Sequence, residues 1–311
     1  MYHPYFRGKQ YELITVRESA KILKNAGFCP IIEPVRESLG GLEKALDAVV
    51  DADGRAIVIV NPHHGDAGSD AVTELLSEQY LSKPQISAGI LLKAEMTADE
   101  AAKCFEVHVE HAPVAIHAGF SDAKKLLEKL GAPNHNQRHV FFEKHGKIYQ
   151  RQFKGSQRIL LRDGFVKRRN ADYEKEEAFS DLHLTYEDEG MTGFGDFLIV
   201  GDEYSESGGP AYAIAIHLTF IDPQRDHEMR VYHFKSDRLD TPRDPAGKFA
   251  EALEKMIETL DAPSSKVLES SAVREFRSLH DRGHFPGLGY IKKLSMNHHI
   301  ETLAHFFDPA N

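Results

Sequence analysis

The chain has 311 residues, with 48 acidic and 38 basic side chains, so its formal net charge is −10 at pH 7. This balance argues against a nucleic-acid binder that relies on overall positive potential, and it leaves only a local basic groove for such contacts. The polar start, the lack of an apolar run of membrane-spanning length and the presence of only two cysteines predict a cytoplasmic protein without a membrane span, signal peptide or disulfide framework.

The first half of the chain repeats one unit, in which a short β-branched apolar run is followed by a loop and then by a charged stretch with helical periodicity. The apolar runs are residues 30–35, 56–60, 86–92, 114–117 and 140–143. Their starts recur every 25 to 30 residues. That interval is close to the ~31 residues of one strand-helix unit in an eight-fold barrel of about 250 residues. Alternation of this kind predicts a parallel sheet covered by helices.

The second half is less regular. Apolar runs at 159–165, 197–200, 211–220 and 230–234 predict further strands, and 197–200 is expected to be the seventh. A long insertion, 169–210, surrounds that seventh strand, and three helices at 246–260, 266–279 and 294–307 end the chain. The prediction is an α/β, (β/α)-barrel-like single domain over residues 1–311, with extra C-terminal helices and a long insertion before the seventh strand. The alternative is an open doubly wound sheet with an antiparallel second half.

Ionisable residues stand at the ends of most of these runs. In a barrel the C-terminal strand ends converge on one mouth, where barrel enzymes place their chemistry. The candidate catalytic residues are therefore Glu33, Lys93, His117, Glu143, Arg162 and Asp196. Carboxylates would serve as acid, base or metal ligand, Lys93 or Arg162 as charge stabiliser and His117 as proton shuttle. The competing interpretation of each is an internal salt bridge, such as Glu33 with Lys93.

A divalent metal is a second expectation for this mouth, because imidazole and carboxylate together suit zinc, manganese or iron. The candidate ligands are Glu33, His63, His64, His117 and Glu143. Adjacent side chains diverge, so at most one of His63 and His64 is expected to point inward.

The insertion mixes aromatic and acidic residues, a composition that suits a protein interface. The predicted partner-binding residues are Tyr173, Tyr186, Asp202, Glu203 and Tyr204. The alternative is that these rings fold inward. The run Lys167-Arg168-Arg169 is the local basic patch that could contact phosphates, although such runs are commonly solvated faces.

Asp196 opens the run 197–200 and is therefore expected at the N-terminal end of a strand. That end of a barrel contributes stability and not catalysis. A structural role, in which the carboxylate fixes the insertion, is favoured over a role in the site.

Several segments together resemble the beta family proteins, and in particular a bacterial branch encoded beside a small PD-(D/E)XK-nuclease-like protein. The opening MYHPYFRGKQYEL, IIEPV at 31–35, VNP at 60–62, FGDF at 194–197, GDEYSESGGPAYAIAIHLTF at 201–220 and GHFPGLGYIKKLS at 283–295 carry this resemblance. It highlights Arg7, Gly8, Lys9, Gln10, Glu33, Asn61, Gly195, Asp196, Asp202, Glu203, Tyr204 and His284. It implies a barrel-like fold and a role in a two-gene, anti-phage-defence-like module, and it supplies no established reaction.

Two functions follow as hypotheses. In the first, the chain is an interaction partner of a nuclease-like protein and docks through residues 169–210. In the second, it is a barrel enzyme, a metal-assisted hydrolase or phosphodiesterase, that uses the polar residues at the strand ends. An open polar mouth would favour the second hypothesis.

Overall fold

A computed structural model describes residues 1–206 and 212–310. The chain divides into two compact units, Met1–Arg162 with Leu182–Phe197, and Asp163–Asp181 with Leu198–Asn311. The single domain expected over residues 1–311 stays a prediction. Among the described residues no helix is both long and apolar enough to cross a bilayer.

The first unit is a barrel of parallel strands that lie side by side in chain order. Its strands are β1 (Tyr5–Phe6), β2 (Ile31–Ile32), β3 (Ala56–Ile59), β4 (Ile86–Lys93), β5 (Val114–Ala118), β6 (Arg138–Phe142), β7 (Gln157–Leu161) and β9 (Gly193–Gly195). Backbone hydrogen bonds from the His3 amide to Phe194 and from the Tyr5 amide to Asp196 join the two edges of the sheet. The barrel-like α/β class is therefore confirmed, with Ile31 and Val140 in one sheet.

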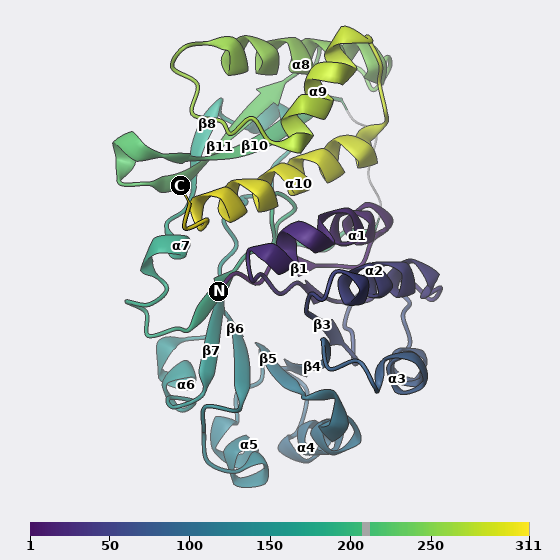
Figure 1. Cartoon of the computed structure of the whole chain (residues 1–311), viewed down its shortest axis with the longest axis vertical. Helices are drawn as coiled ribbons and strands as arrows, with labels where there is room; N and C mark the ends of the chain where they lie inside the picture. The colour runs from purple at the N-terminus through teal and green to yellow at the C-terminus, as the bar shows by residue number, and fades with distance from the viewer. Residues whose placement is uncertain (207–211, 311) are drawn as a thin grey trace. The chain divides into compact units, whose positions relative to one another are not determined.

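Helices lie around the outside of these strands (Figure 1). They are α1 (Gln10–Asn25), α2 (Gly40–Asp51), α3 (Ser69–Leu75) with the π-helical turn η1 (Leu76–Tyr80), α4 (Ala98–Val107) with the 3-10 turn η2 (Val109–His111), α5 (Ala123–Leu130), α6 (Lys147–Arg151) and α7 (Leu182–Thr185). The predicted capping box of Thr97 and Glu100 is present at the start of α4, where it satisfies backbone N–H groups that the helix itself leaves unpaired.

Alternate strand residues fill the inside of the barrel. Its buried cluster is Tyr5, Cys29, Ile31, Ile57, Ile59, Leu91, Val114, Ile116, Val140, Phe142, Ile159, Leu161 and Phe197. Because successive side chains of a strand point to opposite faces, the residues between them, such as His117, face the helices. This alternation decides which polar residues can reach the mouth.

The sequence prediction was wrong about the last barrel strands. Residues 197–200 form no strand, and the strand lies just before them, at β9. A Cβ atom on Gly195 would lie 2.1 Å from the carbonyl oxygen of His3, so only glycine lets β9 approach the start of the chain. Glycine is depleted in strands, which hid β9. The two-residue β1 was also missed, so the long segment precedes the eighth barrel strand and not the seventh.

The second unit is an antiparallel sheet with three helices. The sheet has the order β10 (Ala215–Asp222), β11 (Glu228–Lys235), β8 (Glu176–Ser180), and short 3-10 turns lie at η3 (Asn170–Asp172) and η4 (Pro223–Arg225). The predicted C-terminal helices are confirmed as α8 (Pro245–Asp261), α9 (Ser271–Asp281) and α10 (Leu288–Phe306). Apolar residues of these helices and of β10 share one core. The predicted run 211–220 is thus a strand from residue 215 onward and 230–234 lies within β11, but both strands belong to this sheet and not to the barrel.

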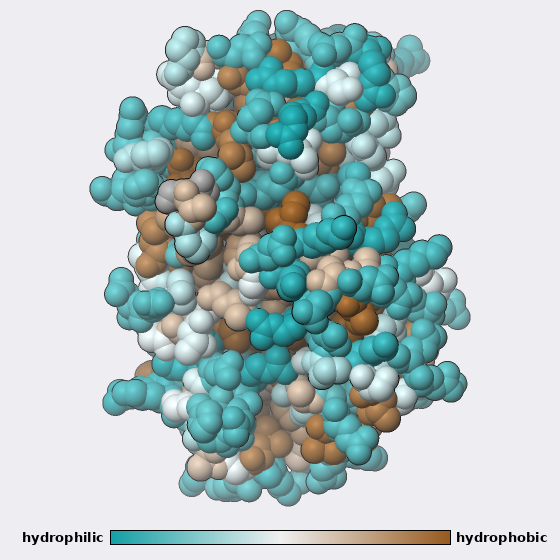
Figure 2. Space-filling model, in the orientation of Figure 1, coloured by the Kyte–Doolittle hydropathy of each residue, from teal (hydrophilic) through white to brown (hydrophobic). Residues whose placement is uncertain are grey.

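Hydrophilic side chains cover most of the face shown in Figure 2, with hydrophobic ones scattered among them. Such a distribution is ordinary for a folded protein surface.

Candidate active site at the barrel mouth

Glu33 follows β2 directly and is the most completely enclosed carboxylate of the barrel, with no exposed surface. Its Oε1 accepts hydrogen bonds from the backbone amides of His63 (2.9 Å) and His64 (3.1 Å) and lies 3.0 Å from His64 Nδ1. Its Oε2 accepts from the Tyr5 hydroxyl at 2.8 Å and from Arg7 Nε at 3.2 Å. The residues after β1, β2 and β3 thus meet at one carboxylate.

The ionisation state of Glu33 follows from these contacts. Burial alone would raise the pKa of its carboxyl, but the hydrogen bonds from His64 and His63 and the charge of Arg7 outweigh it and lower the pKa to about 2. Glu33 is therefore ionised at neutral pH and can only accept. His64 Nδ1 must then carry the proton, which makes Nε2 the basic nitrogen of that ring.

The loop that brings His63 and His64 over Glu33 depends on a tight turn. Gly65 has φ +71°, and a Cβ atom there would lie 2.1 Å from the carbonyl oxygen of Val35. The next amide, of Asp66, donates to that same oxygen. The turn fixes the two preceding amides toward Glu33.

An aromatic floor lies beneath this cluster. The rings of Tyr5, Phe142 and Phe197 contact one another with centroids 5.0 to 5.7 Å apart. The guanidinium of Arg7 lies 5.6 Å from the centroids of both Tyr5 and Phe197. Arg7 is itself buried, so its charge is balanced by Glu33 and by the ring faces.

Three other predicted residues stand at the strand ends as expected. Arg162, after β7, contacts Glu143, after β6, through Nε and a terminal nitrogen, each 2.8 Å from Oε1. Lys93 ends β4 and lies 3.9 Å from Glu95, and not in a pair with Glu33. The side-chain amide of Asn61 donates from Nδ2 to the Leu91 carbonyl and accepts at Oδ1 from the Leu91 backbone amide.

His117 was wrongly assigned to the mouth. It is buried on the outer face of β5, where its ring stacks on Phe141 with a centroid distance of 4.4 Å. Its Nδ1 lies 2.7 Å from the Tyr149 hydroxyl and its Nε2 lies 3.0 Å from His139 Nδ1. Burial and the neighbouring His139 lower its pKa, so it is neutral at pH 7. The sequence correctly placed His117 near the end of a strand, but the alternation of side chains along the strand points it toward the helices and away from the barrel interior.

The five residues predicted as metal ligands do not form one set. Glu33 and His64 are in contact, His63 is exposed and reaches Glu33 through its backbone, Glu143 pairs with Arg162, and His117 faces the helices. Within residues 1–206 and 212–310, no group of three or more His, Cys, Asp or Glu side chains is placed to hold a metal ion.

Asp196 lies at the C-terminal end of β9, not at the N-terminal end of a strand as predicted. Its Oδ1 accepts a 2.6 Å hydrogen bond from the Tyr2 hydroxyl, and both side chains are buried. The contact links the start of the chain to β9, which supports the structural role predicted for it.

We expect Asp196→Asn to destabilise the barrel by about 1–3 kcal/mol, because the amide weakens a buried, charge-assisted hydrogen bond. Thermal unfolding followed by circular dichroism measures the effect, with Asp202→Asn, at a partly exposed residue, as the control. A fully stable Asp196→Asn protein that has lost activity would instead place Asp196 in the site.

The predicted partner-binding residues do not form one exposed aromatic surface. Tyr173 is buried against His233, with ring centroids 4.4 Å apart, and Tyr186 is half-buried against Phe194. Glu203 is exposed, whereas Asp202 and Tyr204 are partly exposed. The rings therefore fold inward, as the alternative held, and association with a nuclease-like partner stays a prediction. Residues 207–210 of the predicted loop lie outside the described residues.

The predicted basic patch is neutralised by acidic neighbours. Lys167 lies 3.2 Å from Glu203, Arg169 lies 2.7 Å from Asp172, and Arg168 contacts Glu177. This run gives little net positive potential for phosphate contacts.

Sequence reasoning missed Tyr5 as a site residue and noted Arg7 only through the family resemblance. Tyr5 lies in a strand of only two residues, too short to give a periodic signal, and Arg7 follows it directly. The pairing of Arg7 with Glu33 joins positions 26 residues apart.

Comparisons with protein-family models, curated proteins and solved structures find no match to this chain. The resemblance to the beta family proteins therefore stays a prediction.

Proposed function

We propose that the barrel unit is a hydrolase of ester bonds in which His64 acts as general base and Glu33 is its positioning residue. The observation that carries this proposal is the 3.0 Å contact between His64 Nδ1 and an ionised, fully enclosed Glu33 at the C-terminal end of the strands. A carboxylate behind one imidazole nitrogen orients the ring and stabilises the imidazolium that forms when the other nitrogen takes a proton.

In the proposed reaction, His64 Nε2 removes a proton from a water molecule, and the water oxygen attacks the phosphorus or carbonyl carbon of the ester. The bond to the alcohol oxygen then breaks, and the alcohol leaves with the proton that His64 returns. The pair of Arg162 and Glu143 and the side chain of Lys93 supply charge at other strand ends of the same barrel. Each of these cations lies beside a carboxylate, so the charges at the mouth do not select between anionic and neutral esters, and a substrate of each kind is tested.

The test compares two adjacent histidines. Hydrolysis of bis(4-nitrophenyl) phosphate and of 4-nitrophenyl acetate is measured for wild type, His64→Gln and His63→Gln. We expect His64→Gln to lower kcat about 100-fold or more, the usual contribution of a general base, with a smaller effect on KM. His63→Gln should stay within about twofold, since only its backbone contacts Glu33. Equal losses in both variants, or no hydrolysis by wild type, would contradict the proposal.

A further inference from the structure

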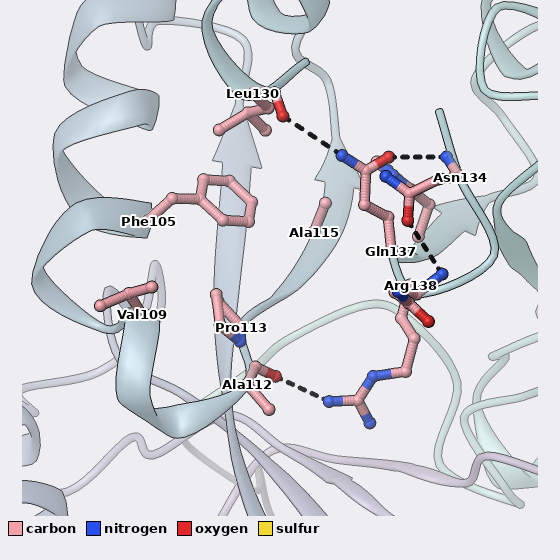
Figure 3. Close-up of a pocket in the computed structure, with 11 residues that line it drawn as sticks. Phe105, Val109, Ala112, Pro113, Ala115, Leu130, Asn134, Gln137 and Arg138 are labelled. Carbon is pink, nitrogen blue, oxygen red and sulfur yellow. Dashed lines mark hydrogen bonds between the residues drawn. The ribbon is translucent and has the colours of Figure 1, made fainter. Parts of the chain in front are cut away.

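A cavity of about 490 Å³ lies between α4 and α5, at the N-terminal ends of β5 and β6 and away from the barrel mouth. Its walls are largely apolar, with polar groups on one side (Figure 3). The lining residues used below are Phe105, Val109, Leu130, Arg138 and His139. A volume in this range suits a ligand of small-molecule size.

Arg138 supplies a positive charge at this cavity that no acidic group balances. Its guanidinium donates to the Ser87 hydroxyl at 2.8 Å and to the Ala112 carbonyl at 2.7 Å, and both acceptors are neutral. No carboxylate of the described residues forms an ion pair with it, and the groups that act on it electrostatically are Cys29 and Arg55. Arg138 is partly buried, and burial lowers the pKa of its guanidinium. A partly buried cation without a counter-charge is costly, and a bound anion would offset that cost.

His139 also lines this cavity, from the face of β6 opposite to that of Arg138, because the two are consecutive strand residues. Its ring is buried, and its Nε2 has no hydrogen-bond partner among the described residues. Burial raises the pKa of Tyr149, so its hydroxyl stays protonated and can donate to His117 Nδ1. His117 Nε2 then donates to His139 Nδ1, which leaves the His139 proton on Nε2, a buried atom that takes no part in the ligand contacts proposed below.

The opposite wall is apolar and open to solvent. Phe105 and Leu130 are half-buried, and Val109 is 67% exposed. Figure 3 shows Phe105, Val109 and Leu130 on one side, with Arg138 reaching toward Ala112 at an edge of the cavity. Apolar contact area and a single cation thus occur together.

We propose that this cavity binds a small amphipathic carboxylate, whose anionic group pairs with Arg138 and whose apolar body packs against Phe105 and Leu130. The combination of a cation without a counter-charge and an apolar wall favours this class over a neutral apolar ligand or a free inorganic anion. The site is separate from the barrel mouth and does not depend on the hydrolase proposal.

The first experiment is titration calorimetry with 4-phenylbutyrate and its neutral amide, 4-phenylbutyramide, at physiological salt. The two probes share the apolar body and differ only in charge. We expect the carboxylate to bind at least tenfold more tightly than the amide. Equal affinities, or no binding of the carboxylate at millimolar concentration, would overturn the proposal.

Two exposed valines provide a matched pair of variants. Val109→Glu places a negative charge on the cavity wall, whereas Val107→Glu makes the same change at a 58% exposed residue that does not line it. We expect Val109→Glu to weaken carboxylate binding at least tenfold and Val107→Glu to change it less than twofold. Binding unaffected by Val109→Glu would place the ligand elsewhere.

Arg138→Gln tests the cation itself. It should reduce the preference for the carboxylate over the amide to less than threefold, while the amide still binds. Because Arg138 also bridges Ser87 and Ala112, the variant is first checked for cooperative unfolding. If it does not fold, the valine pair and the two probes still decide the question. A folded Arg138→Gln protein that keeps the full preference would contradict the assignment.

Discussion

Acidification from pH 7 to pH 4 is expected to unfold this protein, because its buried histidines are neutral in the folded state. Burial lowers the pKa of His139, His233 and His298 to about 4 each, and burial together with the N-terminal amine lowers that of His3 to about 3. An unfolded histidine has a pKa of about 6.5. Below that pH the unfolded chain binds protons that the folded chain cannot.

The direction of the pH effect on stability, and the pH range in which it acts, follow from this difference between the folded and unfolded pKa values. The stability contribution of each such histidine is fully present above about pH 6.5 and is lost as the pH falls toward 4. At pH 5.5 each histidine costs on the order of 1 kcal/mol, so the four together cost about 4–6 kcal/mol, comparable with the whole stability of a typical domain. Circular dichroism should record the loss of folded signal near pH 5, and a protein folded at pH 4 would contradict the prediction.

Two variants, one at a buried and one at an exposed histidine, test whether the buried histidines cause the loss of stability in acid. His139→Phe keeps an aromatic ring beside Phe141 and Phe153 and removes one titrating group, so the decline of stability between pH 6.5 and 4 should become shallower by up to about 1.4 kcal/mol per pH unit. The same analysis of His135→Gln, at an exposed histidine, should give the wild-type slope.

Glu33→Gln is expected to be the most destabilising conservative substitution at the barrel mouth, by about 3–5 kcal/mol. It leaves the buried Arg7 without its carboxylate and presents an amide NH₂ to groups that are themselves donors. The comparison is Glu143→Gln, whose side chain is 45% exposed and pairs with Arg162, and which should cost less than about 1 kcal/mol. Chemical denaturation at pH 7 measures both.

A double variant distinguishes the buried charge from simple loss of packing. If the lost ion pair between Arg7 and Glu33 causes the destabilisation, Arg7→Met combined with Glu33→Gln should be more stable than the sum of the two single effects predicts. Strict additivity would contradict this explanation. The pKa of Glu33, about 2, also gives it a separate pH window. Its contribution is fully present above about pH 4.5 and is lost as the pH falls through 2, below the range in which the histidines act.

The parallel strands and covering helices of the first half follow from local patterns in the sequence. β2 to β6 bury both faces, so their β-branched runs are continuous and recur at the spacing of a strand-helix unit. The sequence also placed Glu33, Glu143, Arg162 and Lys93 at strand ends, because a charged residue directly after a buried run needs a partner or a wet edge.

The closure of the barrel and the set of side chains that share a site depend instead on long-range contacts. β1 and β9 are too short or too rich in glycine to give a local signal, and their pairing depends on backbone contacts between residues nearly 200 positions apart. The burial of His117 on the outer face and the meeting of Arg7, Glu33 and His64 depend likewise on strand alternation and long-range hydrogen bonds. Local residue propensities do not predict these arrangements, because the contacts that stabilise them exist only once the sheet has curved and closed.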